Sequence, residues 1–126
     1  MLRAAWPRID VTTVDVSLKA MFTDSLFNII STSTSLSAQY IAKYATRRTF
    51  LWDEVAAASL IEPRIITKTR DVYMDVVISH GPSCGHTLTW AGERRPVTGV
   101  RMVHAQVDLD LAAFTKLFVG AMTGRP

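Results

Sequence analysis

The alternation of apolar and polar residues predicts strands and helices along the whole chain. β-branched residues alternate with polar ones over residues 9–16, which predicts a strand. Thr23 is a typical helix cap in front of an apolar segment, so a short helix is expected after it. The serine and threonine tract 31–35 interrupts this pattern and supplies the cap for a second helix, over residues 36–48.

The second half of the chain changes to a period of two. Apolar and polar residues alternate over 65–79, which predicts a long strand, and a turn containing glycine and proline separates it from a short strand at 87–90. A further strand is expected over 100–107. Asp108 or Asp110 then caps a last amphipathic helix. This mixture is α/β or α+β, and periodicity alone does not choose between them.

Composition and charge restrict the classes of function. The chain has 126 residues, 48% of them apolar and 20% charged, which is typical of one globular domain. Its formal charge of +3 is scattered without a basic stripe, so we expect no nucleic-acid partner. No apolar run reaches the length of about 18 residues that a membrane span needs, so we expect no membrane partner. The single cysteine, Cys84, excludes an internal disulfide, and we expect a cytoplasmic protein without a secretory signal.

The segment 50–63 carries the most specific candidate chemistry. Trp52 and Asp53 stand side by side where a loop leads into a helix of small residues, predicted over 54–61 and ended by Pro63. Aspartate is a strong helix N-cap, so one interpretation of Asp53 is purely structural. The other interpretation is that the carboxylate of Asp53 faces a cation or another ligand. Trp52 likewise has two interpretations, packing in the interior and stacking on a ligand.

Other candidate residues have structural explanations as well. Tyr40 and Tyr44 lie one helical turn apart, as expected for aromatic residues on one face of a helix. Asp71 and Asp75 point to the same side of a strand and are interpreted as an exposed face. The His-x3-Cys-x-His segment 80–86 has side chains that bind zinc, but three ligands on one turn do not make the usual closed site of four. We therefore interpret it as a polar turn.

Several stretches, in a common order, resemble the inosine–uridine-preferring nucleoside hydrolase family. They are residues 6–17, 52–63, 72–76, 85–87 and 103–114. The pair Trp52-Asp53, followed by two alanines and by Glu62-Pro63, is similar to the family's late metal-binding motif. The chain also departs from the family. Trp52 stands where many members have histidine, which resembles the purine-preferring branch, and Ser83-Cys84 stands in place of a Thr-Arg pair.

The resemblance implies a fold, an activity and a site. Residues 1–126 would be a single partial domain, the C-terminal part of a nucleoside-hydrolase-type, Rossmann-like α/β domain with mixed strands and helices. The implied activity is hydrolysis of the N-glycosidic bond of a purine or pyrimidine ribonucleoside by a calcium-held water. Asp53 would be a metal ligand, Trp52 would stack on the base, and Tyr40 or Tyr44 would contact the substrate.

The resemblance also implies that this chain holds too few ligands to act alone. Calcium takes about six to eight oxygen ligands, and Asp53 is the one side chain that the resemblance nominates. The family's Asp-rich opening segment and its ribose-binding middle segment have no counterpart here. We therefore assign no catalytic residue in this chain, and expect it to be silent unless a homo-oligomer or a complementing N-terminal half supplies the rest. The alternative is a non-catalytic assembly or binding module derived from the same fold.

Overall fold

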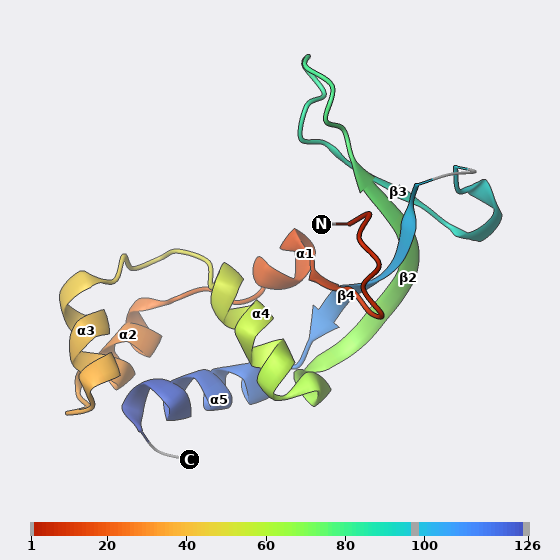
Figure 1. Ribbon diagram of the computed structural model, residues 1–126. Coiled ribbons are helices and arrows are strands. Elements are labelled where there is room, and N and C mark those ends of the chain that lie inside the picture. Colours follow the sequence, from red (N-terminus) through yellow and green to blue (C-terminus); the bar gives the residue numbers. More distant parts are fainter. Residues whose placement is uncertain (1, 97–98, 125–126) are drawn as a thin grey trace. The chain divides into compact units, whose positions relative to one another are not determined.

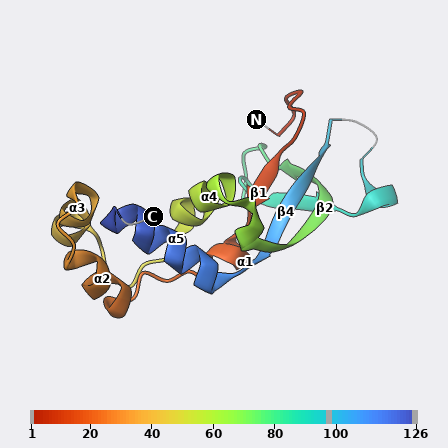
Figure 2. The same ribbon diagram turned by 90° about the horizontal axis from the view of Figure 1, so that it is seen from below.

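The computed structural model describes residues 2–96 and 99–124, and its elements belong to two compact units. Unit 1 comprises Met1–Val11 and Thr69–Gln106, and unit 2 comprises Thr12–Lys68 and Val107–Pro126. In chain order (Figures 1 and 2) the elements are β1 (Asp10–Thr12), α1 (Val14–Ser17), α2 (Asp24–Ser31), α3 (Leu36–Tyr44), α4 (Trp52–Ile61), the 3-10 turn η1 (Pro63–Ile65), β2 (Ile66–Val76), β3 (Thr87–Trp90), the 3-10 turn η2 (Gly92–Arg94), β4 (Arg101–Leu109) and α5 (Leu111–Thr123). Within the described residues, no helix combines the length and the apolar character that crossing a membrane requires.

The strands form one mixed sheet in the order β1-β4-β2-β3. Strands β2 and β3 are an antiparallel hairpin, with Tyr73 opposite Trp90 and Val76 opposite Thr87. The predicted turn closes this hairpin: the Gly85 amide donates to the Val77 carbonyl at 2.8 Å. Gly85 has φ +87°, a conformation that glycine adopts without steric cost. The long strand, the turn and the short strand predicted for this part of the chain are thus confirmed.

The hydrophobic core of unit 2 is built from segments far apart in the sequence. Its buried side chains come from all five helices, from η1, from the end of β4 and from the connecting loops. Phe114 of α5 is 1% exposed and stacks on Phe118, with ring centroids 5.9 Å apart. Phe22 packs edge-on against Phe118 at 6.2 Å. The fully buried residues with large side chains include Val16, Ile30, Val55 and Ile65.

Three helices, α2, α3 and α5, begin at a cap that the sequence predicts. Thr23 accepts a hydrogen bond from the Leu26 amide (3.2 Å) at the start of α2. Ser35, the last residue of the Ser/Thr tract, accepts from the amide of Ala38 (3.1 Å) at the start of α3. Each side-chain oxygen satisfies a backbone N–H that has no partner inside its helix.

Of the two candidate caps of the last helix, Asp110 has this role and Asp108 does not. Asp110 accepts from the Ala113 amide at 2.9 Å. Asp108 instead forms an ion pair with Lys19 at 2.6 Å, and the hydrogen bond from Lys19 is the main cause that lowers the pKa of Asp108.

The Ser/Thr tract has a second role that the sequence did not reveal. The Ser33 hydroxyl donates to the carbonyl of Thr123 at 3.3 Å, and the Ser35 hydroxyl donates to the carbonyl of Met122. Both acceptors lie in the last turn of α5, where carbonyl groups have no partner within the helix. The turn between α2 and α3 is therefore attached to the end of α5.

The largest differences from the predicted boundaries concern two elements. The strand predicted over 9–16 ends at Thr12, and Val14–Ser17 is the short helix α1. Tertiary packing overrides the β-branched pattern here, because α1 places Val16, which is 0% exposed, in the core of unit 2. The helix predicted over 36–48 ends at Tyr44. The backbone leaves the helix at Ala45, which is extended with ψ 137°. Farther along, Arg48 has φ +60°, and its side chain pairs with Asp24 at 2.8 Å.

Candidate functional site

The start of α4 presents Trp52 and Asp53 on an anchored helix end. The preceding residue, Leu51, is 4% exposed, and its amide donates to the carbonyl of Ala20 at 2.8 Å. One turn later Val55 is fully buried, and its amide donates to the Leu51 carbonyl at 3.2 Å. The backbone around Trp52 and Asp53 is therefore fixed from both sides, while both of these side chains remain exposed.

The structural interpretation of Asp53 as an N-cap is wrong. The helix begins at Trp52, the cap position belongs to Leu51, and no side chain caps this end. Asp53 lies in the first turn instead, together with Glu54. A carboxylate in the first turn interacts favourably with the positive end of the helix dipole. With no capping bond to make, the Asp53 carboxylate is free to point toward a ligand.

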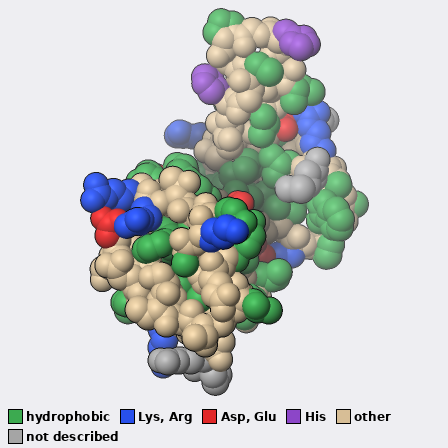
Figure 3. Space-filling view, turned by 90° about the vertical axis from the view of Figure 1, so that its left-hand side faces the viewer, with side chains coloured by type: hydrophobic (Ala, Val, Ile, Leu, Met, Phe, Trp, Pro, Cys, Tyr) green, Lys and Arg blue, Asp and Glu red, His purple; other side chains and the backbone are tan. Residues whose placement is uncertain are grey.

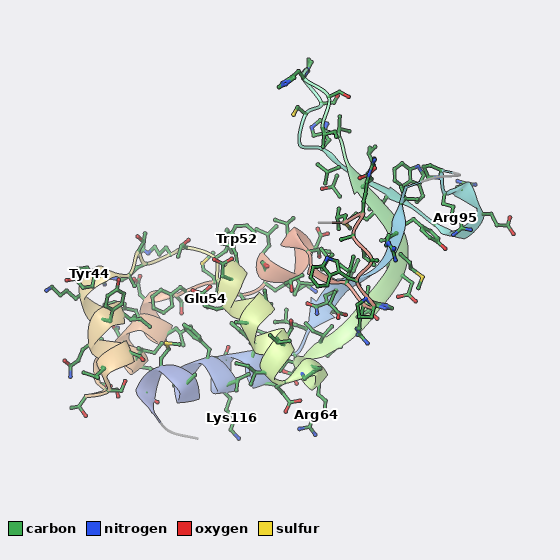
Figure 4. All side chains as sticks on the ribbon, viewed as in Figure 1. Tyr44, Trp52, Glu54, Arg64, Arg95 and Lys116 are labelled. Carbon is green, nitrogen blue, oxygen red and sulfur yellow. The ribbon has the colours of Figure 1, made fainter. Side chains whose placement is uncertain are left out.

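Trp52 combines packing with exposure. Its ring meets Phe50 edge-on, with centroids 5.4 Å apart, yet 42% of the residue remains exposed. Figure 4 shows it at the beginning of α4. An indole that packs against a neighbouring ring and is partly exposed has aromatic surface available for a planar ligand. The two interpretations of Trp52 are therefore compatible.

The two tyrosines form a separate aromatic pair on α3. The rings of Tyr40 and Tyr44 lie 4.8 Å apart, and both residues are well exposed, at 67% and 60%. The ammonium group of Lys43 lies 5.0 Å from the centre of the Tyr44 ring. Figure 4 shows Tyr44 well apart from Trp52. The structure therefore does not join the phenols and the indole into one aromatic cluster, and their predicted role in substrate binding stays a prediction.

The residues present do not by themselves make a calcium site. Asp53 contributes one carboxylate, and calcium takes about six to eight oxygens. Within residues 2–96 and 99–124, no group of three His, Cys, Asp or Glu side chains is arranged to hold a metal ion. The segment 80–86 belongs to the exposed turn of the β2–β3 hairpin and forms no such group either. Asp53 as a calcium ligand therefore stays a prediction that requires oxygens from elsewhere.

A groove of about 900 Å³ lies between α2 and α5, away from the predicted site residues. Ile29 of α2 and Leu111, Lys116 and Val119 of α5 are among the residues that line it. Its lining includes neither Trp52 nor the tyrosines of α3. The groove is large enough for a small ligand. However, the residues that line it include no acidic or aromatic side chain, so it has neither the carboxylate nor the stacking ring that the predicted chemistry requires.

Polar and charged side chains of unit 1 form pairs that sequence reasoning missed. The His104 imidazole of β4 lies 2.6 Å from the carboxylate of Asp71 on β2, and Arg3 pairs with Asp75. Arg8 donates two hydrogen bonds, of 2.7 and 2.8 Å, to Asp10, and these lower the pKa of Asp10. Of the two β2 aspartates, Asp75 is thus ion-paired and Asp71 is in hydrogen-bond contact with an imidazole, so they are not simply a solvated face.

The positive charges do not merge into one surface on the face drawn in Figure 3. Lys and Arg side chains appear there in separate groups, with hydrophobic and neutral polar side chains between them. Several guanidinium groups are held by carboxylates, as in the pairs formed by Arg47 and Arg48 with Asp24. The expectation that no nucleic acid is bound stays a prediction.

Removing Arg64 should raise the pKa of Glu62, just beyond the end of α4. Two side-chain hydrogen bonds of 2.8 Å from Arg64, joined by one from its backbone, lower the Glu62 pKa from 4.5 to about 2. This pair therefore stabilises the fold above pH 4.5, and its contribution disappears as the pH falls toward 2. In the variant Arg64→Ala, NMR titration should find the pKa of Glu62 raised toward its ordinary value, with the backbone hydrogen bond of residue 64 still holding it somewhat low. Lys116→Ala is the control that should leave it low, and an unchanged value in Arg64→Ala would contradict the pairing.

The class of fold follows from comparison with solved structures. The chain has the α/β fold of nucleoside hydrolases and matches the C-terminal portion of that fold, as the sequence predicted. No family model and no curated protein matches the sequence.

Three particular structures show the extent of this likeness. An inosine–guanosine nucleoside hydrolase superposes with a TM-score of 0.74 at 17% identity, over 93% of this chain and 40% of that one. A purine-preferring ribonucleoside hydrolase from Gardnerella vaginalis gives 0.68 at 20% identity, over 93% and 40%. A plant nucleoside hydrolase gives 0.72 at 15% identity, over 90% and 41%. The chain therefore spans about two-fifths of the length of these proteins, and identities this low establish the fold alone.

Proposed function

We propose that this chain supplies the base-stacking indole and one metal-facing carboxylate of a ribonucleoside N-glycosidase. The observation that carries the proposal is the exposed pair Trp52 and Asp53 at the anchored start of α4, in a chain with the nucleoside hydrolase fold. The substrate would be a purine or pyrimidine ribonucleoside. We favour purines, because a large bicyclic base offers an indole more stacking area. This also assigns the chain to the purine-preferring type of the inosine–uridine hydrolase family.

The same proposal requires a second source of ligands. Calcium, when bound, would activate and orient the attacking water. Asp53 provides one of its ligands, so the others must come from a homo-oligomer or from a complementing N-terminal half. Tyr40 or Tyr44 would make an additional contact with the substrate. We place the protein in the cytoplasm, because its one cysteine, the exposed Cys84, is a free thiol.

Nucleoside binding by Trp52 should be visible in its own fluorescence. With Trp6 and Trp90 replaced by phenylalanine, Trp52 becomes the sole tryptophan of the chain. Titration with guanosine or inosine should then quench its emission, and uridine should do so less. Stacking of one base on an aromatic side chain contributes about 1–3 kcal/mol, so Trp52→Ala should weaken binding at least about fivefold. Isothermal calorimetry measures that loss. Emission unchanged by millimolar purine nucleoside would refute the stacking role.

A turnover assay separates catalysis from the assembly alternative. The purified chain is given inosine, guanosine and uridine with calcium, and free base is measured. We expect no turnover, because Asp53 alone does not hold calcium. Sustained base release that is lost in Asp53→Ala would show a complete site within the chain or its oligomer. Absence of both turnover and nucleoside binding, together with a stable dimer in sedimentation, would favour the non-catalytic assembly module.

A further inference from the structure

The outward face of α4 is apolar, although it is exposed. The inward residues of this helix, Val55 and Ala58, are 0% and 6% exposed and belong to the core of unit 2. On the other side, Leu60 and Ile61 are 83% and 72% exposed. The seven residues between Glu54 and Glu62 include no charged side chain, and Ser59 is the only polar one. A helix that is apolar on all sides is typical of one covered on both faces.

The helix α3 shows what a water-facing helix of the same chain looks like. It also exposes a large aliphatic residue, Leu36, at 85%. However, Ser37, Gln39 and Lys43 are exposed on the same helix, so its surface is mixed. Single exposed apolar residues on such a surface are ordinary, whereas a continuous apolar stripe marks an interaction site. Leu36 is therefore the natural control for Leu60.

We infer that the apolar face of α4, formed by Ala56, Ala57, Leu60 and Ile61, docks the part of a nucleoside-hydrolase-type α/β fold that this chain does not span. The solved structures of this fold contain well over twice as much chain, since 40% of their length matches here. The partner is thus an apolar surface of that remaining portion of the fold.

The position of Asp53 connects this surface to the candidate site. Asp53, Ala56, Ala57 and Leu60 follow one another at intervals of three and four residues, so they share one face of α4. A partner that covers the whole of this face would reach Asp53 and could place further oxygen atoms beside the carboxylate. A second copy of this chain would bring only the same side chains again. The inference rests on the proposed function, because the docked portion is what completes the site.

Co-expression tests the surface directly. The tagged chain is produced together with the portion of the Gardnerella vaginalis purine-preferring hydrolase that the superposition leaves uncovered. We expect the two polypeptides to purify as a complex. The double substitution Leu60→Asp and Ile61→Asp should reduce recovery of the complex at least tenfold, because it places two carboxylates in an apolar contact. The milder pair Leu60→Ala and Ile61→Ala should reduce it less. Leu36→Asp should leave it unchanged, and circular dichroism checks that every variant is folded.

The outcomes are distinct for the surface and for the function. No complex with the unmodified chain, or equal recovery with the double aspartate variant, overturns the inference. A homodimer that the same variant dissolves also overturns it, because a second copy then occupies the face. A complex that depends on Leu60 and Ile61 but releases no base supports the surface and refutes the proposed function. Base release by the chain without any partner, unaffected by the double variant, supports the function and overturns the surface.

Discussion

Replacing Phe114 with alanine should destabilise the protein more than most other single truncations. Phe114 is 1% exposed and stacks on Phe118 in the core of unit 2. Removing a buried ring forfeits its burial and leaves a cavity, which costs about 3–5 kcal/mol. Whole domains are stable by only about 5–15 kcal/mol, so the variant should lie near the limit of folding. Urea unfolding followed by circular dichroism measures the loss as a lower midpoint with an unchanged slope.

Leu111→Ala is the matched control for this prediction, because Leu111 begins the same helix but is 45% exposed. Its truncation removes less buried surface and should cost under about 1 kcal/mol. Equal losses for the two variants would mean that Phe114 does not hold the core position that the structure gives it.

An aspartate in place of Val55 should have an effect of similar size by a different mechanism. Val55 is 0% exposed on the inner side of α4. A carboxylate buried at this position has no cationic partner, and burial of an unpaired charge costs several kcal/mol. The carboxyl group is therefore accommodated only in its protonated form, with a raised pKa. We expect a mostly unfolded chain at pH 7 and partial recovery near pH 4, where protonation removes the charge. Circular dichroism as a function of pH checks both statements.

Ala57→Asp controls for the helix itself. Ala57 is exposed on the opposite side of α4, so the new carboxylate remains in water. The cost should then be about 0.7 kcal/mol or less, the difference in helix propensity between alanine and aspartate. If Ala57→Asp were as damaging as Val55→Asp, the assignment of the inner and outer faces of α4 would be wrong.

The elements that were predicted well from sequence are those specified by local chemistry. Thr23 and Ser35 cap α2 and α3 because a hydroxyl next to free backbone amides is a local arrangement that sequence alone reveals. The β2–β3 hairpin was predicted for the same reason, since glycine-rich turn chemistry and a period of two both act over a few residues. As expected, α4 ends before Pro63, and Glu62 is the one residue between the helix and the proline.

The features that were missed depend on residues far away in the chain. The pattern of residues 9–16 favours a strand, but packing of Val16 in the core turns its second part into α1. The segment after α3 makes a contact that the local pattern does not reveal, because Arg48 pairs with Asp24 at a separation of 24 residues. The partners of Asp71 and Asp75 depend on which strands are neighbours, and a single sequence does not give that order. Register and strand order are tertiary information.

The candidate site was predicted in part for the same reason. That Trp52 and Asp53 stand together at a loop-to-helix transition followed from the sequence, whereas the sequence left open whether Trp52 is buried, and the structure shows it exposed. The capping role of Asp53 was wrong because α4 begins one residue before it, at Trp52, and helix boundaries are uncertain by a residue or two from pattern alone. The tyrosines were expected to share a face, and they do, with their rings in contact.

The attachment of the Ser/Thr tract to α5 has a consequence for the order in which the protein forms during translation. Ser33 and Ser35 bond to carbonyls that lie 90 and 87 residues later in the chain. The corner between α2 and α3 therefore closes only after the chain has emerged from the ribosome as far as Thr123. Until then α2 lacks the helix that covers its apolar side, and such late, non-local closure slows folding and leaves nascent chains prone to aggregation.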